Sequence, residues 1–86
     1  MIIVAKKRFL KAYAKLKASQ REKVDLALRS FLKDPKDPIL RNHALKGTLV
    51  GKRAISAGFD LRIVFKVEDD YVRVLMLTVG THNQVY

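Results

Sequence analysis

The chain has 86 residues, 49% of them hydrophobic, and its 18 lysines and arginines against eight acidic residues give a formal net charge of +10. This length supports one small core, so we expect residues 1–86 to form a single domain. The absence of cysteine excludes disulfides and thiolate metal sites and favours a reducing, cytoplasmic setting. The basic balance predicts an anionic partner such as nucleic acid, a membrane surface or an acidic protein.

The N-terminal segment predicts a strand followed by a basic helix. Residues 2–4 form a three-residue apolar run, too short for the apolar core of a signal peptide, and no segment has transmembrane length. We interpret this run as a first strand. From Lys6 to Lys17, apolar residues recur every three to four positions, which predicts a helix with one buried stripe. Its other residues are almost all lysine or arginine.

A second helix is expected to follow after a short link. Ser19 is the predicted N-cap, with Glu22 completing a capping box. The apolar stripe continues to about Lys33, and the helix should end before Asp34-Pro35, because proline disfavours helix in the residue before it. The two helices would form an αα-hairpin.

The second half of the chain predicts three antiparallel strands. The expected strands are residues 52–57, 61–67 and 71–79, with turns at 57–60 and 68–70. The last strand is apolar on both faces, which is typical of a central strand. The order β-α-α-β-β-β predicts an α+β domain with a mostly antiparallel sheet and both helices on one face. The other face is expected to be concave and partly open.

Cations are predicted on that open face. If Ile63 and Phe65 face the helices, Arg62 and Lys66 must face the other way, and Lys52 and Ser56 join them from the preceding strand. Lysines at such positions are usually solvated. An arginine within an apolar strand is costly unless it meets an anion, so Arg62 is the stronger candidate for phosphate binding.

The two histidines and one aspartate suggest acid–base chemistry beside that arginine. His43 lies in a predicted loop, and His82 follows the last strand in the polar terminal stretch Gly80–Tyr86. Either histidine alone is more often structural than catalytic. Together with Asp60 and Arg62 at one rim of the sheet, they would supply a base for an RNA 2′-hydroxyl, an acid for the leaving 5′-oxygen and positive charge for the phosphate. No metal or other cofactor is then required.

Other site chemistries lack their motifs. The sequence contains no phosphate-binding glycine loop, no dinucleotide fingerprint and no zinc-ligand spacing. Ser56 is not in a nucleophile elbow, and the carboxylate cluster of a two-metal nuclease is absent.

Several segments, in order and spacing, resemble the RelE superfamily of bacterial toxins, and most of all its YafQ-like branch. The resemblance covers essentially the whole chain. The matching segments are Asp37-Pro38, Asn42-His43-Ala44-Leu45-Lys46-Gly47, Gly51-Lys52-Arg53, Asp60-Leu61-Arg62-Ile63-Val64-Phe65-Lys66, Gly80-Thr81-His82 and Tyr86.

The resemblance implies the toxin of a type II toxin–antitoxin pair, acting as an mRNA endonuclease. Such toxins enter the A site of the 70S ribosome and cut the codon there with the 2′-hydroxyl as nucleophile and no metal. A small acidic antitoxin neutralises them. The charge of +10 is consistent with a pocket walled by ribosomal RNA, to which binding should weaken steeply with salt.

The resemblance also implies residue roles. By position, His43 and His82 match the acid–base pair, Asp60 the acidic residue that orients an imidazole, Arg62 the phosphate-facing arginine and Tyr86 the terminal aromatic. We expect further RNA contacts from five polar or basic residues, which are Lys46, Lys52, Arg53, Ser56 and Lys66.

The chain departs from the family pattern at three positions. Ser56 replaces a frequent histidine, Leu61 a frequent tryptophan and Thr78 a frequent arginine. We hypothesise that Arg62 compensates for the arginine missing at Thr78. Two alternatives stay open at this point: a gyrase inhibitor of the ParE type, which needs no acid–base set, and a passive RNA-binding module.

Overall fold

The computed structural model describes all residues from Met1 to Tyr86 and contains five strands, three α-helices and two short 3₁₀ helices. In chain order these are β1 (Ile2–Ala5), α1 (Lys7–Ala14), α2 (Ala18–Lys33), η1 (Pro38–Leu40), β2 (His43–Ala44), η2 (Gly47–Leu49), β3 (Arg53–Ala57), β4 (Leu61–Glu68), β5 (Arg73–Thr81) and α3 (His82–Val85). The predicted α+β architecture is confirmed, with β2 and α3 as additions.

The sheet has the strand order β1-β5-β4-β3-β2. Strand β1 pairs parallel with β5, and the other neighbours are antiparallel. The predicted strand 71–79 is shifted, because β5 starts at Arg73 and continues to Thr81. Asp69, Asp70 and Tyr71 have φ values of 50°, 50° and 71°, a left-handed conformation that an extended strand does not contain.

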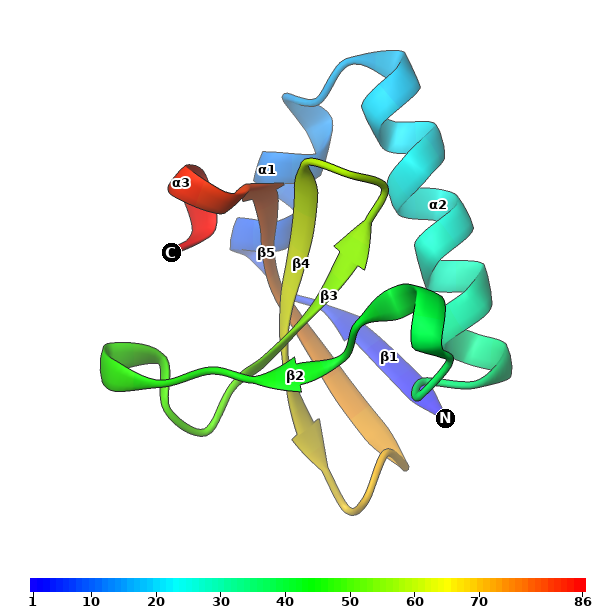
Figure 1. Cartoon of the computed structure of the whole chain (residues 1–86), viewed down its shortest axis with the longest axis vertical. Helices are drawn as coiled ribbons and strands as arrows, with labels where there is room; N and C mark the ends of the chain where they lie inside the picture. Colours follow the sequence, from blue (N-terminus) through cyan, green and yellow to red (C-terminus); the bar gives the residue numbers. More distant parts are fainter.

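One face of the sheet carries the main core. Helix α2 lies along this face, on the right of the strands in Figure 1. Thirteen buried residues form the cluster, including Val24, Ala27 and Phe31 of α2. Phe31 packs edge-on against Phe65 of β4 at a centroid distance of 5.1 Å, a favoured aromatic geometry. The predicted inward alternation of β4 is confirmed, because Leu61, Ile63 and Phe65 all belong to this cluster.

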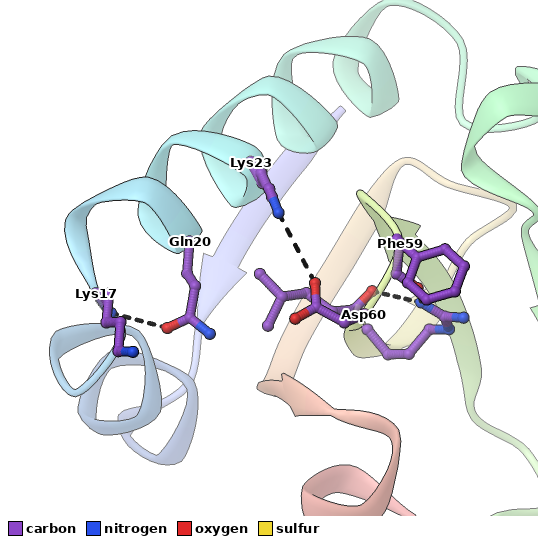
Figure 2. Close-up of polar contacts among 7 residues, drawn as sticks. Lys17, Gln20, Lys23, Phe59 and Asp60 are labelled. Carbon is purple, nitrogen blue, oxygen red and sulfur yellow. Dashed lines mark hydrogen bonds and ion pairs between the residues drawn. The ribbon is translucent and has the colours of Figure 1, made fainter.

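The predicted start of the second helix was wrong. Helix α2 begins at Ala18 with Lys17 as N-cap, so Ser19 lies inside the first turn. The side chain of Gln20, and not that of Glu22, accepts a hydrogen bond from the Lys17 backbone N–H at 2.9 Å (Figure 2). A glutamine at the third helical position satisfies this donor as a glutamate would.

None of the helices is both long and apolar enough to span a bilayer.

The second face of the sheet is only partly open, as expected, but the helix that covers part of it was not predicted. Helix α3 turns back onto it, on the side opposite α2 (Figure 1), and buries Val85 against Ala54 and Val64. Gly80 permits this return, since a Cβ atom there would lie 2.7 Å from Gln84 Oε1. That oxygen accepts the Thr81 backbone N–H at 2.8 Å. The C-terminal residues therefore have a fixed position over the sheet.

Candidate active site

A cavity of about 1010 Å³ opens between α2, η1, the β3–β4 turn and the first residues of α3. Three predicted catalytic residues line it: Asp60, Arg62 and His82. Ser56, a predicted RNA contact, lines it as well. The sheet register explains this grouping, because Ser56 pairs with Arg62, and Arg62 pairs with Gly80, two residues before His82.

Arg62 is seated without a carboxylate partner. Its Nη1 donates to the backbone carbonyl oxygens of Phe59 at 3.2 Å and Leu61 at 2.8 Å. The two salt bridges of the molecule, Lys23–Asp60 and Arg73–Glu68, do not involve it. Carbonyl groups of its own turn orient this arginine in the free protein, and its predicted contact with a phosphate stays a prediction. A guanidinium has five N–H donors, so donors remain for a phosphate.

Asp60 points toward helix α2. Its Oδ1 lies 3.9 Å from Lys23 Nζ, with both side chains about half exposed (49% and 50%). Figure 2 shows the two groups facing each other across the space between α2 and the β3–β4 turn. An ion pair this exposed contributes little to stability. The predicted contact between Asp60 and an imidazole is replaced here by the lysine.

His82 is the first residue of α3, and Tyr86 follows directly after its last residue. Their rings meet edge-on at a centroid distance of 4.5 Å and an interplanar angle of 89°. Burial raises the pKa of the Tyr86 hydroxyl, and the positive charge of Arg62 partly opposes this increase. Tyr86 is therefore a protonated hydrogen-bond donor at neutral pH and lies within the electrostatic reach of Arg62.

His43 is not a cavity-lining residue, so the predicted meeting of both histidines at one spot is only partly realised. The residue lies in edge strand β2 rather than in a loop, and it pairs with Ala54. Paired residues point to the same face, so its exposed side chain shares the face of Ser56 and Arg62. His43 Nδ1 is 2.8 Å from the Arg41 carbonyl oxygen. Since that oxygen only accepts, Nδ1 carries the hydrogen and Nε2 is free to take a proton.

The side chains predicted to contact RNA differ in exposure and in the hydrogen bonds that they already make. Lys46 and Lys66 are exposed, whereas Lys52 and Arg53 are half-buried. Arg53 Nε donates to Asn42 Oδ1 at 2.7 Å. Asn42 in turn donates to the Tyr71 hydroxyl at 3.0 Å and the Pro35 carbonyl at 2.9 Å. Arg53 therefore helps hold the segment before β2 against the β4–β5 turn, a structural task that its sequence position did not indicate.

The cavity-lining residues that were not predicted as site residues include Lys23, Ile39, Arg41 and Phe59. Phe59 gave a usable signal, because an aromatic residue between Gly58 and Asp60 lies in a predicted turn, where exposure is expected. Lys23 and Ile39 gave none, because their approach to the cavity depends on how α2 and η1 pack. Nowhere in the chain do three or more His, Cys, Asp or Glu side chains form a group able to hold a metal ion.

Comparison with solved structures assigns the fold and the family. A copper-bound mutant toxin from Helicobacter pylori is 30% identical, with 100% of this chain and 99% of that chain covered and a TM-score of 0.70. The chain belongs to the same family as this bacterial toxin and has the RelE/YafQ-like toxin fold. YafQ from E. coli has the same fold, with a TM-score of 0.78 at 18% identity over 98% of this chain and 96% of that chain.

Antitoxin complexes also occur among the matching structures. The toxin chain in the E. coli DinJ–YafQ toxin–antitoxin complex matches with a TM-score of 0.73 at 20% identity, covering 98% of this chain and 94% of that chain. A scan against protein-family models and a search of curated proteins find no match. The RelE/YafQ resemblance noted in the sequence is thus confirmed by structure.

Proposed function

We propose that this toxin is a ribosome-dependent endoribonuclease that cuts mRNA in the A site through attack of the RNA 2′-hydroxyl, without a metal. The observation that carries the proposal is the cavity shared by Arg62, Asp60 and His82, in which the guanidinium has no carboxylate partner. Its partners would be the 70S ribosome with bound mRNA and an acidic antitoxin, and its setting would be the cytoplasm.

The proposed reaction needs two proton transfers. A base removes the proton of the 2′-hydroxyl, the oxygen forms a bond to phosphorus, and the P–O5′ bond breaks while an acid protonates the leaving oxygen. The products are a 2′,3′-cyclic phosphate and a 5′-hydroxyl. His82 is placed to exchange one of these protons at the cavity wall. The unpaired Nε2 of His43, on the same face of the sheet, is our candidate for the other.

The remaining residues would act on charge and orientation. Arg62 would donate to the non-bridging phosphate oxygens, where negative charge grows in the transition state. Tyr86 would donate a hydrogen bond or stack on a base, since its raised pKa keeps the hydroxyl protonated. Asp60 would act after RNA binding, when its exposed pair with Lys23 can be exchanged for an imidazole.

The net charge of +10 supports binding to a ribosomal site that is lined by RNA. Lys46 and Lys66 are exposed and free of salt bridges, so they are available to phosphates. Lys52, Arg53 and Ser56 would add contacts on the same half of the sheet. The logarithm of the binding constant for the ribosome should fall linearly with the logarithm of salt concentration, because each phosphate contact releases a counterion.

The test is cleavage of ribosome-bound mRNA in a translation extract, mapped by primer extension. Wild-type toxin should give cuts positioned at codons, and His82→Ala should reduce their rate by about 10²–10⁴-fold, the usual contribution of an acid or base. Lys33→Ala, an exposed residue at the far end of α2, is the control and should cut at the wild-type rate.

A different outcome would identify another activity. Intact message together with trapped gyrase–DNA complexes would replace the nuclease by a gyrase inhibitor. If His82→Ala still arrests growth, and neither cut message nor trapped gyrase–DNA complexes are found, the protein is a passive RNA-binding module.

A further inference from the structure

Among the non-glycine residues, left-handed backbone is confined to two segments. Arg41 has a φ of 51°, and residues 69–71 have φ values between 50° and 71°. Residues with a Cβ atom rarely adopt this conformation, and it persists only where surrounding contacts hold it. Arg41 directly precedes Asn42 and His43, whereas residues 69–71 lie in the turn between β4 and β5. Any bond that joins these two distant segments therefore holds two strained turns at once.

The side chain of Asn42 is that bond. Its Nδ2 donates to the Tyr71 hydroxyl at 3.0 Å and to the Pro35 carbonyl oxygen at 2.9 Å. Its Oδ1 accepts from Arg53 Nε at 2.7 Å. The half-buried amide thus uses both of its hydrogens and its oxygen, and its partners come from three separate parts of the chain. The Tyr71 ring also packs against Phe31 of the main core at a centroid distance of 6.1 Å, so the network is anchored in the packed face.

The backbone held by this network orients His43. The Arg41 carbonyl oxygen lies 2.8 Å from His43 Nδ1. The left-handed φ of 51° and ψ of 45° at Arg41 set the direction of that carbonyl, and a right-handed or extended residue would turn it away. The bond keeps the ring hydrogen on Nδ1 and leaves Nε2 with a free lone pair. Strand β2 has only two residues, so it gives the exposed imidazole little other support.

We propose that Asn42 is a positioning residue for His43, with Arg53 and Tyr71 as its supports. The amide holds the left-handed turn at Arg41, the turn directs the Arg41 carbonyl, and the carbonyl selects the Nδ1–H form of the imidazole. Nε2 is then ready to exchange a proton with RNA, although Asn42 itself touches no reacting atom. This inference rests on the proposed function, because proton transfer by His43 is what gives the orientation a purpose.

The first test is the rate of cutting of ribosome-bound mRNA. Asn42→Ala should lower kcat by about 10–100-fold, because a small displacement of an acid–base group costs much of its effect. KM should stay within about threefold, since the uncharged amide makes no contact with the bound RNA. Asn42→Asp should retain most of the rate, because its two carboxylate oxygens can accept from Arg53 Nε and from the Tyr71 hydroxyl.

A pair of hydroxyl deletions separates positioning from general stability. Tyr71→Phe removes one bond of the network and should lower kcat by an intermediate amount. Tyr13→Phe is the matched control, because it deletes the hydroxyl of another half-buried tyrosine. That hydroxyl donates to Asp25 Oδ1 at 2.7 Å, in a contact between α1 and α2. Tyr13→Phe should therefore cut at the wild-type rate.

The second test reads the imidazole directly by ¹⁵N NMR at pH 8, where free histidine is neutral. The protein carries His82→Ala, so that His43 gives the only imidazole signals. The parent should show the hydrogen on Nδ1. Asn42→Ala should shift both nitrogen signals toward the mixture of tautomers found in free histidine, whereas Asn42→Asp and Tyr13→Phe should leave them unchanged.

The proposal requires both readouts to change together. Unchanged ¹⁵N signals in Asn42→Ala overturn it, even if cutting is lost, because the amide would then act on folding or on RNA. A changed tautomer with cutting at the wild-type rate overturns it as well, because the orientation would then have no role in the reaction. If the tautomer changes but the wild-type protein does not cut mRNA, the proposed function fails and the control of His43 by Asn42 stands.

Discussion

The two faces of the sheet have different compositions and different tasks. The face under α2 has 13 buried residues and two interlocked aromatic rings. The face under α3 has a buried cluster of three, Ala54, Val64 and Val85, and carries Ser56, Arg62 and the two histidines beside it. A domain of this size has a net stability on the order of 5 kcal/mol, so a single packed face must supply most of it. The other face is then free to hold cations and acid–base groups.

The largest expected effect comes from the packed face. Phe31→Ala removes a fully buried ring that contacts Phe65, and such a change costs about 3–5 kcal/mol. Since this is most of the expected stability, the variant should be largely unfolded at 37 °C. Phe59→Ala, at a 94% exposed phenylalanine, should stay within about 0.5 kcal/mol of wild type. Urea denaturation followed by circular dichroism distinguishes the two. Equal costs would show that the packed face does not dominate.

The next effect is on the polar face and on activity. Arg62→Ala should lower the rate of mRNA cutting by about 10²–10³-fold, the usual cost of losing one transition-state donor. Its cost in stability should be about 1 kcal/mol, because the lost hydrogen bonds go to carbonyls of a half-exposed turn. Arg62→Lys should recover only part of the rate, because an ammonium lacks the planar fork of a guanidinium. Single-turnover cleavage measures the loss of rate, and urea denaturation measures the loss in free energy of unfolding. If the two losses, both expressed as free energies, are equal, the polar face does not act mainly on activity.

Gly80 allows helix α3 to pack on the second face of the sheet. A methyl group there would meet Gln84 Oε1 at 2.7 Å, so Gly80→Ala should push α3 off the sheet at a cost of about 1–3 kcal/mol. Cleavage should fall further than stability predicts, because His82 and Tyr86 move with the helix. The double variant Gly80→Ala/Gln84→Ala removes the contact with Oε1 and keeps only the contact with the Cβ atom of residue 84 at 3.1 Å, so activity should partly return. No rescue would mean that α3 does not position the site.

The smallest effect is a pH dependence. Burial holds the pKa of Tyr86 above its ordinary value of about 10, and Arg62 partly lowers it. The fold therefore favours the protonated hydroxyl, and this contribution is fully present below pH 10. Above pH 10 the unfolded chain loses its proton first, so stability declines as pH rises toward the folded pKa. Tyr86→Phe should show a smaller decline, measured by urea denaturation at pH 8 and pH 10.5; part of it remains because the hydrogen bond to Asp25 also raises the pKa of Tyr13. Identical slopes would mean that the partial burial of Tyr86, which is 42% exposed, does not raise its pKa.

The sequence predicted the packed face better than the polar one. Alternation in β4 and the three-to-four spacing in α2 are long patterns, repeated over eight and 16 residues, and burial acts on them consistently. They correctly placed Ile63 and Phe65 inside and Arg62 outside.

Short elements were missed for a physical reason. Strand β2 has two residues and α3 has four, fewer than any periodic pattern needs, so tertiary contacts determine them. The cap at Lys17 depends on which glutamine or glutamate reaches back, and Gln20 does so. The distance between His43 and the cavity, and the approach of Lys23 to Asp60, follow from how β2 and α2 pack. Neither is encoded in local spacing.

The central claim is that residues on the polar face of the sheet cut RNA by promoting attack of the RNA 2′-hydroxyl on the adjacent phosphate. The most direct measurement uses ribosomes programmed with a message that carries a single 2′-deoxy nucleotide at the mapped cleavage position. We predict that the all-ribose message is cut, leaving a 2′,3′-cyclic phosphate, and that the 2′-deoxy message stays intact under the same conditions. Cutting of both messages at the same rate, or of neither, would contradict the account.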